Sequence, residues 1–233
     1  MASFVKESIE SSNHKCVGMY DPLGNGNYKD LKEIVNKIDG IIDFSHFSLT
    51  EEILKYAIEI NSPLVIATTG HTDEQKLKIE EASKRIAILK ATNTSLGVNI
   101  MNQIVSYATK LLADFDIELI EKHHNRKIDA PSGTAVTLLE VINESLSEKK
   151  KIVYGREGNK KREKNEIGVH AIRGGNIVGE HTVIFSGGDE IIEIKHEALS
   201  RKIFADGAVK AILSLINKPS GLYLMKDILN INN

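Results

Sequence analysis

The stretch that decides the fold lies in the middle of the chain, where residues 118–135 read ELIEKHHNRKIDAPSGTA. A short apolar strand leads into the adjacent histidines His123 and His124, and Lys127 follows soon after them. A polar turn then leads into a helix whose N-cap we expect to be Ser132, because serine accepts a hydrogen bond from the free N–H groups of a first helical turn. A strand that ends in ionisable residues beside a helix start predicts a ligand site at that end of the strand.

The residue types in this stretch suit a substrate that carries carboxylates and must receive a proton. Histidine titrates near neutrality and suits proton transfer, while the lysine ammonium donates a proton or holds a carboxylate. The N–H groups of the helix start near Gly133 and Thr134, together with the helix dipole, are expected to make an anion site. Glycine lets a ligand come close to the backbone. The sequence therefore predicts a cationic pocket for a dicarboxylate.

Two other interpretations of the histidines stay open at this point. Paired histidines in a loop are often merely exposed. A metal site would have to draw on the histidines His123, His124, His170, His181 and His196. Adjacent histidines on a strand point to opposite faces, and the chain shows no usual ligand spacing, so we expect no metal.

Upstream of this stretch, short apolar strands alternate with helices. We expect strands over 16–20, 40–44, 63–67 and 86–89, and helices over 3–11, 31–38, 50–60 and 73–83. Continuous apolar runs of this kind are typical of strands buried on both faces of a parallel sheet. The first half is therefore expected to be α/β, with helices on both faces and ligand-binding turns at the carboxyl ends of the strands.

The pattern changes after Asn93. We expect helices over 98–113, 132–146 and 205–216, and alternating strands over 177–185 and 190–196. A hairpin turn at Gly187–Asp189 joins the two strands, so the second half is expected to be α+β with a largely antiparallel sheet. Residues 149–164 hold eight lysines and arginines, which form either a solvated loop or a loop that folds over an acidic substrate.

The composition excludes several classes of protein. With 233 residues, 41% hydrophobic and 27% charged, the chain is typical of globular proteins. A formal net charge of -2 gives no global attraction to nucleic acid or to membrane surfaces, and no apolar run is long enough to span a bilayer. Cys16 is the only cysteine, which excludes an intrachain disulfide and favours a reducing cytoplasm.

A second stretch, IGVHAIRGGNIVGEH over residues 167–181, is by itself a polar strand, a Gly-Gly turn and a second strand, and its charged residues could simply pair within a sheet or across a subunit contact. Together the two stretches resemble the dihydrodipicolinate reductase family of bacterial lysine and diaminopimelate synthesis. The family pattern E-x-H-H-x-x-K-x-D-A-P-S-G-T-A is matched from Glu121 to Ala135 without a departure. Shorter segments also resemble the family, namely Arg156-Glu157-Gly158, Asp43-Phe44-Ser45, Thr68-Thr69-Gly70, Ser200-Arg201 and Phe204–Ala208.

The resemblance implies a fold, a reaction and roles for particular residues. It implies a Rossmann-type cofactor domain over 1–94 with 204–233, and a substrate and tetramerisation domain over 95–203. The implied reaction removes water from 4-hydroxy-tetrahydrodipicolinate and delivers hydride from a nicotinamide, giving tetrahydrodipicolinate. His123 resembles the catalytic acid/base and Lys127 the proton donor. The residues that resemble the holders of the substrate carboxylates are His124, Ser132, Gly133 and Thr134.

The same resemblance implies NADH, NADPH or both as cofactor. Asp21 is expected at the end of a strand, where an acidic residue binds the ribose hydroxyls of the adenosine. The residues expected around the nicotinamide half are Ala67, Thr68, Thr69, Ala91, Thr92, Asn93 and Thr94. Pro22 stands where some family members carry an arginine for the 2′-phosphate, so we expect NADH to serve at least as well as NADPH.

The start of the chain departs from the family. The family begins with a strand and the pattern Gly-x-x-Gly-x-Met-Gly, whereas this chain starts at what resembles its methionine, with Ala2 in place of the last glycine. That turn cradles the cofactor pyrophosphate. We expect the start to have been assigned at an internal methionine and the native protein to be longer by roughly 10–12 residues. Without them, cofactor affinity is expected to be impaired.

Two other functions compete with the reductase. One is a truncated, non-catalytic relative that keeps the oligomeric substrate domain. The other is a different Rossmann oxidoreductase, such as an aspartate dehydrogenase. The intact His123 and Lys127 favour the reductase over both.

Overall fold

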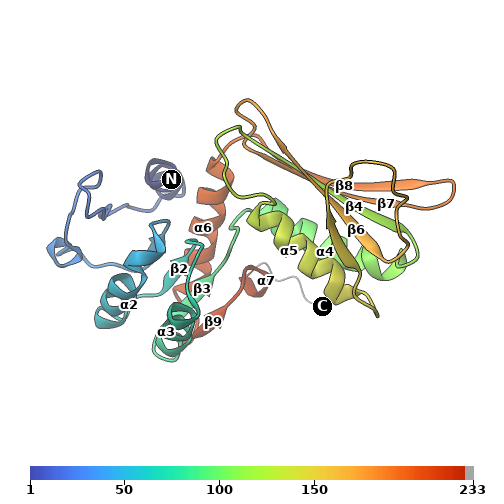
Figure 1. The fold of residues 1–233 in the computed structure, drawn as a ribbon. Coiled ribbons are helices and arrows are strands. Elements are labelled where there is room, and N and C mark those ends of the chain that lie inside the picture. Colours follow the sequence, from blue (N-terminus) through green and yellow to red (C-terminus); the bar gives the residue numbers. More distant parts are fainter. Residues whose placement is uncertain (229–233) are drawn as a thin grey trace. The chain divides into compact units, whose positions relative to one another are not determined.

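The computed structural model describes residues 1–228. The chain divides into two compact units, shown in Figure 1. One unit is Met1–Leu96 together with the chain from Arg201, and the other is Gly97–Ser200. Each unit has its own sheet, with one apolar core on each face of the first sheet and one core on a single face of the second.

The first unit is built on a parallel sheet. Its strands lie in the order β1 (Ile41–Asp43), β2 (Leu64–Ile66), β3 (Ala87–Lys90) and β9 (Gly221–Tyr223). Side chains along β2 alternate between the two faces, as they do in any strand. Leu64 and Ile66 therefore enter one apolar core and Val65 enters the other. The predicted α/β fold with helices on both faces is confirmed.

Helices cover both faces of this sheet. They are α2 (Thr50–Glu59), α3 (Asp73–Ser83), α6 (Lys202–Leu215) and the short α7 (Met225–Ile228), while α1 (Ala2–Ser11) packs on α6. The core on one face takes residues from α2 and α3, and the core on the other face takes residues from α6. Thr72 and Gln75 form a capping box that fixes the start of α3. None of the helices over 1–228 is long and apolar enough to cross a membrane.

Two local predictions for this unit are wrong, and one strand was not predicted. Residues 16–20 form no strand, and Tyr20 makes only an isolated bridge with Tyr28. A strand needs a hydrogen-bonded neighbour, and within the described residues β1 pairs only with β2. The helix expected over 31–38 is a single 3-10 turn, η1 (Leu31–Glu33), because Ile34 already has an extended backbone. The strand β9 was missed because its pairing partner, β3, lies far away in the sequence.

The second unit is built on a mixed five-stranded sheet. Its strands lie in the order β5 (Lys151–Tyr154), β6 (Glu166–Arg173), β4 (Asp116–His123), β7 (Gly179–Ser186) and β8 (Ile191–Ala198). The expected antiparallel pairing holds for β4 with β7 and for β7 with β8. The pairs β5–β6 and β6–β4 are parallel. The strand β5 lies inside the basic run that the sequence predicted to be a loop.

Two helices, α4 (Leu96–Leu111) and α5 (Gly133–Ser145), cover one face of this sheet (Figure 1). Ile117 and Leu119 of β4 point toward them and are fully buried. The two-residue period of a strand then places Glu121 and His123 on the same covered face. The fold therefore carries two ionisable side chains from β4 to the end of an apolar core. The other side of the sheet is called the open face below.

Gly207, in the middle of α6, tests the packing of the first unit. A Cβ at this position would overlap the backbone carbonyl of Thr94, which cannot move aside as a flexible side chain can. We predict that Gly207→Ala lowers the free energy of unfolding by about 1–3 kcal/mol, although helix propensity alone would favour alanine by roughly 0.5–1 kcal/mol. Urea unfolding measures the change.

The matched control is Gly188→Ala, because a Cβ at Gly188 meets no atom within 4 Å. Its stability should stay within about 0.5 kcal/mol of the unmodified protein. Equal stability of the two variants would contradict the close approach of α6 to Thr94.

Candidate active site

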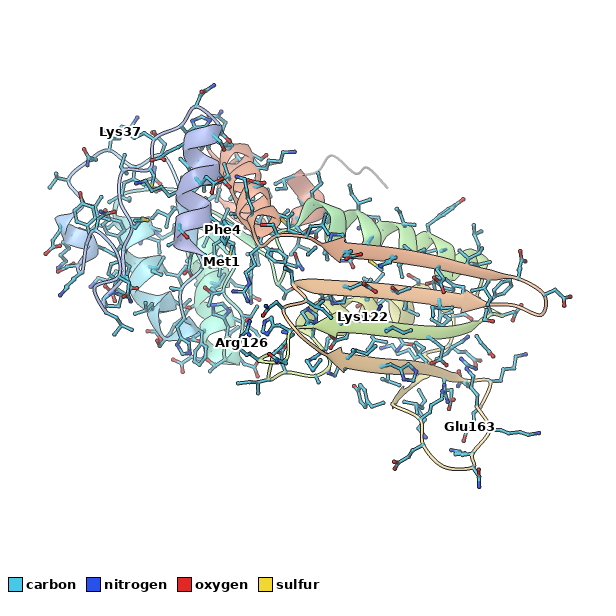
Figure 2. All side chains as sticks on the ribbon, turned by 90° about the horizontal axis from the view of Figure 1, so that it is seen from above. Met1, Phe4, Lys37, Lys122, Arg126 and Glu163 are labelled. Carbon is cyan, nitrogen blue, oxygen red and sulfur yellow. The ribbon has the colours of Figure 1, made fainter. Side chains whose placement is uncertain are left out.

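The candidate site lies where β4 ends and α5 begins. His123 is the last residue of β4, His124 and Lys127 lie in the turn that follows, and Ser132 is the N-cap of α5. Figure 2 shows Lys122 on this strand and Arg126 on the turn beyond its end. The chain thus brings the six residues predicted for catalysis and substrate binding into one continuous segment, His123, His124, Lys127, Ser132, Gly133 and Thr134.

Glu121 lies at the centre of the hydrogen bonds in this segment and is fully buried. Its Oε2 accepts from His123 Nδ1 at 2.7 Å and from Arg173 Nη1 at 2.7 Å. Its Oε1 accepts from Arg173 Nη2 at 2.7 Å and from the backbone N–H of Ser132 at 3.0 Å. Two oxygens therefore receive four hydrogen bonds from three different elements, β4, β6 and the start of α5.

These bonds fix the charge of Glu121. Burial by itself would raise the pKa of this carboxyl group, but the hydrogen bonds from His123 and Arg173 outweigh it and bring the pKa down to about 2. Glu121 is therefore ionised at neutral pH. Because an ionised carboxylate only accepts hydrogen bonds, the proton on the facing nitrogen of His123 belongs to Nδ1.

The second ring nitrogen of His123 faces a space that a glycine leaves open. The nearest atom to a Cβ built on Gly179 would be His123 Nε2, at 3.1 Å. Gly179 lies beside His123 because β7 pairs with β4 in that register. With Nδ1 held by Glu121, Nε2 is the nitrogen that remains for chemistry.

Lys127 is oriented by its own loop. Its ammonium nitrogen lies 2.7 and 2.8 Å from the two carboxylate oxygens of Asp129. The backbone N–H of Lys127 donates to the His124 carbonyl at 3.1 Å, which closes the turn after β4. The Asp129 carbonyl accepts from Arg173 at 2.7 Å, so the arginine that holds Glu121 also supports this loop.

The start of α5 is where the sequence predicts the anion-binding part of the site. Ser132 Oγ accepts from the backbone N–H of Ala135 at 3.2 Å, which confirms the predicted N-cap. A Cβ at Gly133 would meet nothing within 4 Å, so there is room for a ligand against the backbone there. The first N–H groups of a helix have no partner within it, and they carry the positive end of its dipole.

His181 of β7 supports this helix start from below. Its Nε2 lies 2.8 Å from Ser132 Oγ, and its ring meets that of His123 edge-on at a centroid distance of 5.2 Å. Burial, and after it the charge of His123, lower the pKa of His181 to about 3. His181 is therefore neutral at physiological pH and serves as a hydrogen-bonding support.

The predicted cofactor residues of the first unit lie at the carboxyl edge of its sheet. Ala67–Thr69 follow β2 and Ala91–Thr94 follow β3. The Thr68 hydroxyl donates to the Ser45 carbonyl at 3.3 Å, which ties the loops after β1 and β2 together. The Thr94 hydroxyl donates to the Phe204 carbonyl at 2.7 Å. The structure thus collects these loops at the edge where open α/β sheets bind nucleotides.

Asp21 lies outside any strand. Its Oδ1 accepts from the backbone N–H of Leu23 at 2.8 Å and its Oδ2 accepts from Asn25 Nδ2 at 3.1 Å. Both oxygens are therefore used within its own loop in this conformation. A role in binding the ribose stays a prediction.

The structure also describes the histidines considered for a metal site and the basic stretch over residues 149–164. Over residues 1–228 no group of three or more histidine, cysteine, aspartate or glutamate side chains is arranged to hold a metal ion. In the basic stretch, Arg156 and Arg162 both pair with Glu118, on the open face of the sheet, at 2.6 and 3.2 Å. Figure 2 shows Glu163 on the loop that joins β5 to β6.

Sequence reasoning missed the roles of Glu121, Arg173 and His181. One available signal was Glu121 itself, since it follows Ile117 and Leu119 at the two-residue period of a buried face. A carboxylate at such a position needs a cation. Nothing in the spacing, however, points to Arg173 as that cation.

Comparison with known proteins gives the same family for both halves of the chain. A family model described as dihydrodipicolinate reductase, N-terminus, matches residues 1–94, and one described as dihydrodipicolinate reductase, C-terminus, matches residues 97–229. A 4-hydroxy-tetrahydrodipicolinate reductase of Brachyspira hyodysenteriae is 48% identical over 230 residues, which cover 98% of this chain and 95% of the relative. One from Clostridium tetani is 51% identical over 193 residues, 82% of this chain and 76% of the relative.

Solved structures agree on the fold. The dipicolinate-bound dihydrodipicolinate reductase from Paenisporosarcina sp. TG-14 superposes with a TM-score of 0.75 at 22% identity, covering 99% of this chain and 94% of that one. A probable dehydrogenase from Thermotoga maritima gives a TM-score of 0.61 at 8% identity, covering 97% of this chain and 89% of that one. The chain belongs to the dihydrodipicolinate reductase family.

Proposed function

We propose that this protein reduces 4-hydroxy-tetrahydrodipicolinate to tetrahydrodipicolinate in diaminopimelate and lysine biosynthesis, with NADH or NADPH as hydride donor. The observation that carries the proposal is the segment from β4 to α5, where His123 and Lys127 adjoin an open helix start at Gly133. Relatives that match nearly the whole chain bear the name of this reductase, so the prediction holds over a non-catalytic relative and over an aspartate dehydrogenase.

The segment supplies two kinds of group that such a substrate requires. The N–H groups at Gly133 and Thr134, with the dipole of α5, bind one substrate carboxylate, and His124 lies nearby to assist. The ammonium group of Lys127 is the proton donor to the substrate ring as hydride arrives. His123, with Nδ1 held by Glu121, presents Nε2 as the acid/base that assists the loss of water.

The nicotinamide cofactor supplies the hydride when bound. In our proposal the loops at Ala67–Thr69 and Ala91–Thr94 hold its nicotinamide half and Asp21 approaches its ribose. The donor set fits, because these loops offer backbone groups and hydroxyls at the carboxyl edge of a parallel sheet. Asp21 would have to release Leu23 or Asn25 to accept ribose hydroxyls.

We also propose that the protein is a cytoplasmic homotetramer, assembled through the open face of the five-stranded sheet. This face carries Ile172 and Ile191, which are 45% and 64% exposed, and ion pairs such as Lys122–Glu180. No described helix covers it. An uncovered sheet face with apolar side chains is a candidate surface for association with further copies.

Lys127→Ala tests the proposed chemistry. We predict that the unmodified chain oxidises NADH or NADPH when the preceding synthase of the pathway generates the substrate in situ. Loss of the proton donor should lower kcat by about 10²–10⁴-fold. The absorbance of the reduced nicotinamide follows the reaction. Lys110→Ala, which removes an exposed cation of α4, should keep the unmodified rate. A Lys127→Ala variant as active as this control would contradict the assignment.

The cofactor preference is tested by comparing initial rates with NADH and NADPH. Pro22 follows Asp21 at the point where an arginine would neutralise a 2′-phosphate, so this chain lacks that arginine. We predict that NADH gives a kcat/KM at least equal to that of NADPH. A much higher value with NADPH would contradict the prediction.

A further inference from the structure

We propose that Glu121, clamped by Arg173, is a positioning residue that couples the acid/base His123 to the carboxylate-binding start of α5. The proposal rests on the proposed function, because it explains how the two halves of that site are held in register. Glu121 itself does not touch the substrate in this account. It acts through His123 on one side and through Ser132 on the other.

The inference rests on the different hydrogen-bond donors of the two carboxylate oxygens of Glu121. Oε2 receives the His123 Nδ1–H, and Oε1 receives the backbone N–H of Ser132. Arg173 donates one N–H to each oxygen, at 2.7 Å in both cases. A rotation of the carboxylate plane would weaken the hydrogen bonds to His123 and to Ser132 together. The bidentate hydrogen bonds from Arg173 oppose that rotation.

Ionisable groups from several strands and from the loop after β4 surround Glu121. Arg173 faces it from β6, His181 adjoins it from β7, His196 lies across from His181 on β8, and Lys127 and Asp129 flank the loop above. Among these groups only Arg173 ion-pairs with it permanently, since His181 is neutral. Glu121 is wholly inaccessible to water, so its charge depends on the bonds described.

The same strand offers a matched control. Glu118 lies on the open face of β4 and is also an ionised carboxylate, paired with Arg156, Arg162 and His170. It makes no contact with the site segment. A purely structural ion pair at Glu121 would therefore behave as Glu118 does when its charge is removed.

The experiment compares Glu121→Gln with Glu118→Gln in three measurements. Kinetics give kcat and KM, calorimetry gives the Kd for dipicolinate as a planar dicarboxylate probe, and circular dichroism checks folding. We expect Glu121→Gln to lower kcat by about 100-fold, because misplacement of a reacting group by about 1 Å costs that much. KM and the dipicolinate Kd should rise together by roughly tenfold, a loss of about 1.4 kcal/mol. Glu118→Gln should change each by less than about twofold, and size-exclusion chromatography checks that this variant keeps its assembly state, because Glu118 lies on the open face.

Arg173→Lys keeps the positive charge but loses the bidentate hydrogen bonds to Glu121. It should lower kcat and raise KM and the dipicolinate Kd, each by less than Glu121→Gln does. It carries the test if Glu121→Gln does not fold. Equal effects of Glu121→Gln and Glu118→Gln, or a fall in kcat with unchanged dipicolinate binding, would overturn the coupling.

A spectroscopic measurement separates this proposal from the proposed function. Nitrogen-15 NMR of the His123 ring, assigned with His123→Gln, reports which nitrogen carries the proton. We expect Nδ1–H alone in the unmodified protein at pH 8 and a mixture of both forms in Glu121→Gln. An unmodified protein that neither oxidises cofactor nor binds dipicolinate contradicts the proposed function. His123 protonated at Nε2 contradicts the positioning role whether or not the protein is active.

Discussion

The ion pair between Glu121 and Arg173 is the interaction on which the site depends. A carboxylate without access to water is tolerated only where its charge is compensated, and both oxygens of Glu121 are bonded to Arg173. The hydrogen bonds of Glu121 and Arg173 also position the other groups of the site. His123 obtains a fixed proton position, the start of α5 obtains a fixed height above the sheet, and Arg173 continues to the carbonyl of Asp129 in the loop of Lys127.

The fold makes this arrangement possible through simple periodicity. The face of β4 that packs on α4 and α5 is apolar as far as Leu119, and its next two positions are Glu121 and His123. The same face of β4 thus carries apolar core residues first and candidate site residues at its end. Because α5 starts soon after β4 ends, the amides at its N-terminus lie beside the same strand end. A long apolar core beneath the site keeps these groups in place.

The sequence predicted what depends on local pattern. The apolar run of β2, the alternation of β7 and β8, and the N-cap at Ser132 all follow from neighbouring residues. It failed where the outcome depends on distant partners, as for residues 16–20, which lack a ladder, and β9, which pairs with β3. For the same reason the sequence did not predict two contacts of the site. Glu121 and Arg173 are 52 positions apart, and Ser132 and His181 are 49 positions apart. Spacing along the chain carries no signal of such contacts.

The most direct test of the account is a double-mutant cycle of Glu121→Gln and Arg173→Met, measured as the free energy of unfolding at pH 7. Arg173→Met leaves the buried charge of Glu121 without its cation, which costs about 3–5 kcal/mol, and Glu121→Gln leaves the half-buried Arg173 without its carboxylate. The account predicts that the double variant is more stable than the sum of the single losses implies, with a coupling energy above about 1 kcal/mol. Additive losses would show that the two side chains do not depend on each other, and would contradict the central place given to this pair.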